Sequence, residues 1–271
     1  MKRSALILSG CFLIGIFSLV PFLWFILTSL KSPTEITAIP PRIIPSFLWG
    51  AYHTALVEHG LLRYMLNSAI VAGGTTLISI AIGSLAAYAL ARFRLRWTRW
   101  YLMLLLAVSM FPQIAIAGPV WRILNFLGWL NTYQGIIAAY IAINLPLAIW
   151  ILTTFFKELP FEIEEAALTD GCTWLQALWH VVLPLAAPAL FTAAILVFIH
   201  AWNEFFFALV ILTYPARQTL PVGIALFPGE YTMPWGDIAA ASTVATLPLI
   251  ILTLFFQRRI VRGLSAGAVK G

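Results

Sequence analysis

Acidic side chains, which can act as acids, bases or metal ligands, concentrate in one short segment of a largely apolar chain. Half of the ten Asp and Glu residues lie between positions 158 and 170, and they are Glu158, Glu162, Glu164, Glu165 and Asp170. The sequence contains no G-x-S-x-G, H-E-x-x-H or G-x-x-x-x-G-K-[ST] motif, and its two cysteines do not form a pair at ligand spacing. We therefore expect no catalytic residue, no metal site, no disulfide and no enzymatic activity in this chain.

The composition places these acids in an integral membrane protein. The 271 residues are 62% hydrophobic and 10% charged, with a mean hydropathy of +0.95, whereas soluble domains carry about 25% charged residues. Six apolar runs reach the roughly 20 residues that a membrane-spanning helix needs. They cover residues 5–30, 64–91, 100–121, 132–156, 185–214 and 238–257. The predicted fold is all-α, with one transmembrane domain over residues 1–271 and a loop at 157–184.

Lysine and arginine counts orient the predicted spans. With both termini in the cytoplasm, the inner segments hold eleven Lys and Arg residues and the outer segments hold five. The net charge of +6 is then a consequence of topology, so no nucleic-acid partner is indicated. The basic run Arg92–Arg99 is expected to lie at the lipid headgroups.

The loop at 157–184 has the sequence pattern of two short helices joined by a bend. Pro160 suits a first helical position, and Gly171 suits a left-handed residue that ends the first helix. Thr173 and Gln176 fit a capping box for the second helix, which Pro184 would end. The segment sums to a charge of −4, which disfavours binding to the negative cytoplasmic leaflet. A structured element that docks into a partner is therefore the favoured interpretation.

The stretch "EEAALTDGCTWLQALWHVVLP" resembles the EAA signature of the membrane subunits of binding-protein-dependent ABC importers. The matching residues are Glu165, Ala166, Ala167, Gly171, Val181, Leu183 and Pro184, with Val181 where the family more often has Ile. "NSAIVAGGTTLISIAIGSLAAYALARFRLRW", "FFKELPFEIEEAA", "AWNEFFFALVILT" and "GLSAGAVKG" are similar to the carbohydrate-uptake branch, in particular to its maltose-type permeases.

This resemblance implies the type I ABC importer permease fold, with six transmembrane helices and a cytoplasmic coupling helix. The coupling residues would be Glu165, Ala166, Ala167, Asp170, Gly171 and Pro184. The implied partners are ATPase subunits that hold ATP and Mg, a second related permease subunit in a heterodimer, an extracytoplasmic sugar-binding protein, membrane lipid and the sugar itself. The implied location is the bacterial plasma membrane. A disaccharide, an oligosaccharide, a polyol or a glycosylated osmolyte would each fit as substrate.

The predicted substrate pathway centres on the one acidic residue inside a span. Glu204 would cost roughly 2.5–3.5 kcal/mol in the middle of a lipid-facing helix, so it should face the bundle interior or a wet cavity. Trp202 and Asn203 beside it could contact the apolar face and the hydroxyls of a sugar. A structural role for Glu204 and Asn203 is an equally good interpretation.

Three further features of the spans concern their shape and packing. Asn144 and Pro146 could open a kink in the fourth span, although an ordinary proline kink is favoured. His200 is expected to be buried and hydrogen-bonded. Small residues at four-residue spacing in the second span favour close packing within the chain over a dimer interface, and they are Ser79, Gly83, Ala87 and Ala91.

Two other functions predict sequence features that differ from those of an importer subunit. A secondary, ion-coupled transporter of a small polar solute would show several intramembrane ionisable residues and two related halves, whereas this chain shows one such acid and no repeat. A membrane-embedded enzyme would show clustered His, Asp or Cys at helix ends, and the sequence contains no such cluster.

Overall fold

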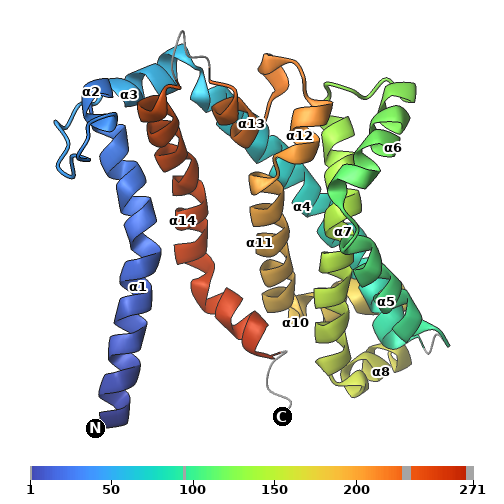
Figure 1. The fold of residues 1–271 in the computed structure, drawn as a ribbon. Coiled ribbons are helices and arrows are strands. Elements are labelled where there is room, and N and C mark those ends of the chain that lie inside the picture. Colours follow the sequence, from blue (N-terminus) through green and yellow to red (C-terminus); the bar gives the residue numbers. More distant parts are fainter. Residues whose placement is uncertain (1, 94–95, 228–232, 267–271) are drawn as a thin grey trace. The chain divides into compact units, whose positions relative to one another are not determined.

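Helices dominate the computed structural model, which describes residues 2–93, 96–227 and 233–266 and, within these, the side chains of 7–93, 96–227 and 233–257 (Figure 1). No strand occurs in these ranges. Four helices contain stretches long and apolar enough to cross a membrane. They are α1 (Lys2–Ser29), α4 (Leu61–Arg92), α7 (Tyr133–Glu158) and α14 (Trp235–Ala266).

Two bent helix pairs raise the number of spans to six if each pair is one span. The first is α5 (Thr98–Ser109) with α6 (Gln113–Phe126), bent by 92°. The second joins the segment Trp174–Leu185 to α11 (Ala187–Asn203), bent by 80°. The structure therefore has four to six candidate spans, and the predicted six is the upper number. The second bent pair includes residues 174–184, which were predicted to lie in the loop between the fourth and fifth spans.

The third predicted span breaks at Pro112 and then continues as a second helix. Pro112 has an extended ψ of 122° and precedes the first residue of α6. Proline also disfavours the helical conformation at the residue before it, so the chain turns here. Pro119, by contrast, lies inside α6 and does not interrupt it.

The fifth predicted span is interrupted as well. Helix α11 ends at Asn203, Glu204 adopts an extended ψ of 127°, and a short helix, α12 (Phe206–Ile211), follows. A 3-10 turn at Pro215–Arg217 and α13 (Leu220–Ala225) come next. Residues 228–232 lie outside the described residues, as does the terminal "GAVKG" from position 267 onward.

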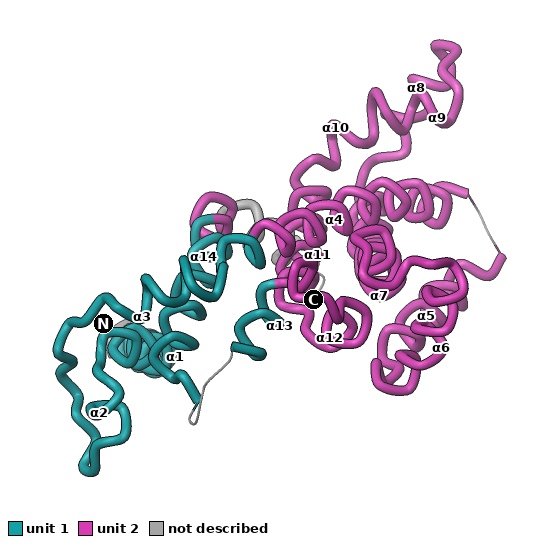
Figure 2. The backbone as a smooth tube through the Cα atoms, turned by 90° about the horizontal axis from the view of Figure 1, so that it is seen from above, with its two compact units in different colours: residues 1–65, 220–251 teal, residues 66–219, 252–271 magenta. Residues whose placement is uncertain are grey.

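Contacts divide the chain into two compact units (Figure 2). Unit 1 contains residues 1–65 and 220–251, and unit 2 contains residues 66–219 and 252–271. The loop at 157–184 and the residues around Glu204 all belong to unit 2. The single transmembrane domain expected from the sequence stays a prediction.

Helix α7 forms the centre of unit 2, where it contacts α5, α11 and α12. Helix α4 also approaches it closely, because a Cβ added at Gly83 would lie 3.3 Å from Ala148 Cβ. Ser79 and Ala87, on the same stripe, are fully buried. The prediction that this small-residue stripe serves packing within the chain is confirmed.

In unit 1, the loop after α1 contains short helices. Its second half forms α3 (Gly50–His53) and a π turn at Thr54–Glu58, and its first half contains α2 (Pro33–Ile36). A capping box at Ser32 and Glu35, with proline at the first helical position, explains α2.

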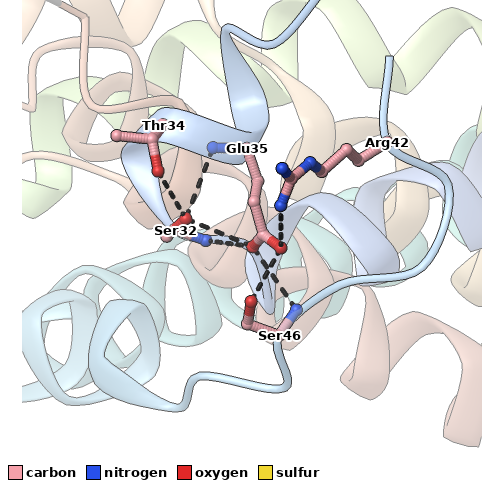
Figure 3. A network of polar contacts seen from close by, with 5 residues as sticks. All are labelled: Ser32, Thr34, Glu35, Arg42 and Ser46. Carbon is pink, nitrogen blue, oxygen red and sulfur yellow. Dashed lines mark hydrogen bonds and ion pairs between the residues drawn. The ribbon is translucent and has the colours of Figure 1, made fainter. Parts of the chain in front are cut away.

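Glu35 connects α2 to the rest of this loop (Figure 3). Its carboxylate accepts hydrogen bonds from the Ser46 hydroxyl at 2.7 Å and from the Ser32 backbone N–H at 2.9 Å. The guanidinium of Arg42 lies 3.8 Å away. The hydrogen bond from the Ser46 hydroxyl and those from backbone N–H groups favour the ionised form, so the pKa of Glu35 falls to about 2.

We predict that this loop loses order in acid. A carboxyl group with a depressed pKa in the folded state contributes stability above its unfolded pKa, about 4.5, and this contribution disappears as the pH falls toward 2. Amide exchange protection at Ser32 and Ser46, corrected for intrinsic rates, should fall across this range. Glu35→Gln should show low protection that does not depend on pH. Wild-type protection that stays constant down to pH 2 would contradict the prediction.

Candidate functional site

The acidic segment, residues 157–184, contains α8 (Phe161–Thr169) as its first helix. The C-terminal end of α8 has the structure that the sequence predicts. Gly171 has a φ of +94°, the left-handed conformation that glycine tolerates best, and its N–H donates to the Leu168 carbonyl at 3.1 Å. The Cys172 N–H donates to the Ala167 carbonyl at 3.0 Å. Pro160 precedes the first helical residue rather than occupying it, a difference of one position.

The second helix of the segment begins at the predicted capping box. Thr173 accepts from the Gln176 N–H at 3.3 Å, and the Gln176 side chain accepts from the Thr173 N–H at 2.8 Å. The helix runs through α9 (Trp174–Ala177), a π turn at Leu178–Val182 and α10 (Leu183–Leu185). The prediction that Pro184 ends this second helix was wrong, because the helix continues to Leu185. The wider π turn shifts the hydrogen-bond register just before Pro184, which lacks an N–H of its own.

The residues of the EAA signature lie mostly on the surface of this chain. Glu165, Ala166, Asp170 and Gly171 are exposed, and Ala167 is half-buried. Figure 2 shows α8 and α9 at one end of unit 2. The structure therefore presents the carboxylates of Glu165 and Asp170 and several small side chains on an accessible surface at α8.

The neighbouring acid, Glu164, has the opposite environment and was not singled out by sequence reasoning. It is 1% exposed, and its carboxylate forms an ion pair with Arg92 Nε at 2.7 Å. It also accepts a hydrogen bond from the Tyr88 hydroxyl. Arg92 and Tyr88 lie one turn apart at the end of α4, a spacing that could have suggested a shared partner.

The expectation that the whole basic run Arg92–Arg99 lies at lipid headgroups was wrong for Arg92. Its side chain is only 6% exposed, because it is used in the pair with Glu164. Arg96 and Arg99 are exposed, as expected, and Arg94 lies outside the described residues.

Tyr88, which binds Glu164, also belongs to a buried apolar cluster. This cluster joins the ends of α4 and α7 to the second helix of the acidic segment and to α11. Its buried members are Ala87, Tyr88, Leu152, Phe156, Leu178, Val182, Ala186 and Ala193. The acidic segment is thus packed into unit 2 by one face and exposed by the other.

A second candidate site in unit 2 is a cavity of about 580 Å³ beside the break between α11 and α12. Its polar lining comes from Gln113, His200, Asn203 and Glu204. Phe205 and Phe206 contribute aromatic surface. Amide, imidazole and aromatic groups around one cavity are suited to a polyhydroxylated ligand.

Glu204 is not in the middle of a helix, contrary to expectation. Its carboxylate accepts from the backbone N–H groups of Phe207, at 2.9 Å, and Ala208, at 3.2 Å. It therefore caps the N-terminus of α12, where the helix dipole favours a negative group. The residue is 7% exposed and still contributes to the lining of the cavity.

The other candidate residues divide between the cavity and the core. Asn203 is exposed and lines the cavity, whereas Trp202 is 5% exposed, stacks on Phe198 and does not line it. Asn144 is buried and donates its amide to the Tyr140 carbonyl at 2.8 Å. The structure thus brings together Asn203 and Glu204, and places Trp202 and Asn144 elsewhere.

Asn144 nevertheless orients a residue of the cavity. Because its amide nitrogen is used toward Tyr140, its oxygen is the acceptor for His200 Nδ1 at 2.9 Å. This leaves Nε2 of the neutral ring as an acceptor. His200 is hydrogen-bonded, as predicted, but it is exposed in this chain rather than buried.

We predict that Glu204→Ala destabilises the protein. It leaves two backbone N–H groups of α12 without their acceptor, and each lost partner costs about 1–3 kcal/mol when buried. Glu204→Gln keeps one acceptor oxygen and should fall between wild type and Glu204→Ala. Thermal unfolding of the three proteins in the same detergent measures the order. Equal unfolding temperatures for Glu204→Ala and wild type would show that the cap contributes nothing.

Comparison with known proteins identifies the family. Residues 79–266 match the family described as "Binding-protein-dependent transport system inner membrane component". The trehalose/maltose transport system permease protein MalG of Thermococcus litoralis is 43% identical over 274 residues, which cover 100% of this chain and 98% of that protein. The sulfoquinovosyl glycerol transport system permease protein SmoH of Agrobacterium fabrum is 41% identical over 272 residues, covering 100% of this chain and 93% of that protein.

A solved structure has the same fold. It is a chain of a bacterial ABC transporter involved in the import of the acidic polysaccharide alginate, with a TM-score of 0.77 and 25% identity, covering 95% of this chain and 97% of that one. The type I importer permease fold and the family resemblance expected from the sequence are both confirmed. The chain is a multi-pass membrane protein and belongs to the family of inner membrane components of binding-protein-dependent transport systems.

Proposed function

We propose that this chain is the permease subunit of an ATP-driven sugar importer and that α8 is its coupling helix. The observation that carries the proposal is the difference in burial between neighbouring residues at α8. Glu164 is buried inside the chain, whereas Glu165, Ala166 and Gly171 of the EAA signature are exposed at one end of unit 2. An exposed carboxylate beside small side chains fits a cleft on a partner that can supply a basic group.

The partner at α8 would be an ATPase subunit, since the sequence lacks a phosphate-binding loop of its own. ATP and Mg would then be bound by that subunit. A second related permease subunit would complete the translocation pathway as a heterodimer, and an extracytoplasmic binding protein would deliver the sugar. The excess of Lys and Arg in the inner segments supports cytoplasmic termini. The proposed location is the plasma membrane of a bacterium.

The substrate would pass the cavity beside the break between α11 and α12. Its lining combines Gln113, His200 and Asn203, which can exchange hydrogen bonds with hydroxyls, with the rings of Phe205 and Phe206. Relatives are named for trehalose/maltose and for sulfoquinovosyl glycerol, so a sugar or a glycosylated polyol is the proposed class.

Charged substitutions at and just after α8 test the coupling assignment. Glu165→Lys reverses a charge on α8, and Gly171→Asp adds a charge just after it. Both variants should lose the ATPase during purification in mild detergent and lower sugar uptake at least about tenfold, because a disrupted contact at a charged interface is worth more than about 1.4 kcal/mol. Both variants should still insert into the membrane. Glu158→Lys is the matched control for Glu165→Lys, since it makes the same Glu-to-Lys change at an exposed position outside α8.

Transport-competent vesicles of either α8 variant would contradict the assignment. Sugar uptake driven by an ion gradient, by this chain without any ATPase, would instead support the secondary-transporter alternative.

Substitution in the cavity tests the pathway. Gln113→Ala removes one side chain that can hydrogen-bond the sugar, so the KM for uptake of trehalose or maltose should rise about two- to tenfold. Co-purification of the ATPase should not change. Asn125→Ala, an exposed amide on the same helix but outside the cavity, is the control. An unchanged KM for Gln113→Ala would remove this residue from the pathway.

A further inference from the structure

We propose that Glu164 is a positioning residue that clamps α8 to the C-terminal end of α4, so that displacement of α8 moves α4 with it. The inference rests on the proposed function for its consequence, since it assumes that α8 is the coupling helix. The clamp itself rests on contacts within unit 2.

Two residues of α4 hold three successive points of the acidic segment. Arg92 Nη2 donates to the Leu159 carbonyl, before α8, at 3.2 Å. Arg92 and Tyr88 both bind the Glu164 carboxylate within α8. The Tyr88 hydroxyl also lies 3.2 Å from the Trp174 carbonyl, after α8. The segments before, within and after α8 therefore share one attachment to α4.

Aromatic rings reinforce the same attachment. The Arg92 guanidinium lies 5.7 Å from the ring centre of Phe161, the first residue of α8. The ring of Phe93, which directly follows α4, meets that of Trp174 edge-on at 5.3 Å. These contacts add two further links between the end of α4 and the acidic segment. The ion pair itself is buried, where it is screened little by solvent.

Burial makes this attachment stiff. Glu164 is 1% exposed and the Arg92 side chain is 6% exposed. If the pair separated, little water could therefore solvate either charge. Separating α8 from α4 would leave two unpaired charges in a poorly hydrated site, which is strongly unfavourable. The lowest-cost motion of α8 therefore carries the end of α4 along.

The adjacent acids of α8 thus have separate tasks. Successive residues of a helix are rotated by about 100°, so Glu164 and Glu165 point to different sides. Glu165 is available to a partner, whereas Glu164 is used inside the chain. Loss of Glu165 should affect docking, and loss of Glu164 should affect what docking does to the membrane helices.

The test uses Glu164→Gln and Tyr88→Phe in the complex with ATPase and partner permease, reconstituted in vesicles. Tyr88→Phe removes only the hydroxyl and keeps the ring in the apolar cluster, so it reports on the clamp even if Glu164→Gln folds poorly. Glu162→Gln, an exposed acid of the same helix, is the control. We expect both clamp variants to retain the ATPase as wild type does. Glu164→Gln should transport at least about tenfold less sugar per ATP hydrolysed, and Tyr88→Phe should give a smaller loss.

A distance measurement on this chain alone separates the clamp from the proposed function. Spin labels at Thr169 on α8 and Leu85 on α4, both exposed, are placed in a variant whose two cysteines are replaced by serine. Wild type should give a narrow distance distribution, and Glu164→Gln a broader one. Unchanged distributions, or wild-type transport per ATP in both clamp variants, would overturn the inference. Failure of wild type to bind any ATPase would overturn the proposed function and, with it, the transmission of motion from α8 to α4.

Discussion

A carboxylate that cannot reach water determines how the acidic segment is built. Glu164 is almost completely buried, so it needs a cation and a hydrogen-bond donor within the chain, and Arg92 and Tyr88 supply them from α4. The rest of the segment follows from this attachment. Its second helix packs into the apolar cluster with α4, α7 and α11, and the remaining face of α8 stays exposed. A stiff inner face and an accessible outer face are what a coupling element requires.

The same rule, that polar groups need partners, explains how the break between α11 and α12 is stabilised. The helix stops at Asn203, and the Glu204 carboxylate takes the free N–H groups of α12. This break puts a carboxylate, an amide and two phenylalanines around one cavity. An unbroken helix would have spread these side chains around its circumference. The irregular backbone and the candidate substrate pathway are therefore one feature, in line with the tolerance of non-helical backbone at membrane depth where it lines a cavity.

Features set by nearby residues were predictable from the sequence. Apolar length gave the spans near α4 and α7 to within three residues, and the conformation of Gly171 and the capping box at Thr173 follow from local backbone rules. Features set by distant residues were not. Tyr88 lies 76 positions from Glu164, and nothing in a single sequence pairs them. The break at Glu204 was not predicted, because the apolar run around it gives no sign that the helix stops there. The backbone N–H groups that the break frees are bonded by the Glu204 carboxylate within the same run.

The most direct test of the account is cross-linking from α8 to the ATPase subunit. A cysteine at exposed Ala166, in a chain whose Cys11 and Cys172 are replaced by serine, is treated with a short thiol-reactive photo-cross-linker in the purified complex. A cysteine at Asn125, exposed on α6, serves as the control. If the exposed face of α8 is the docking surface, the ATPase should cross-link to position 166 and not to position 125. An ATPase that co-purifies but cross-links only from position 125 would contradict the account, since the exposed face of α8 would then not be the docking surface.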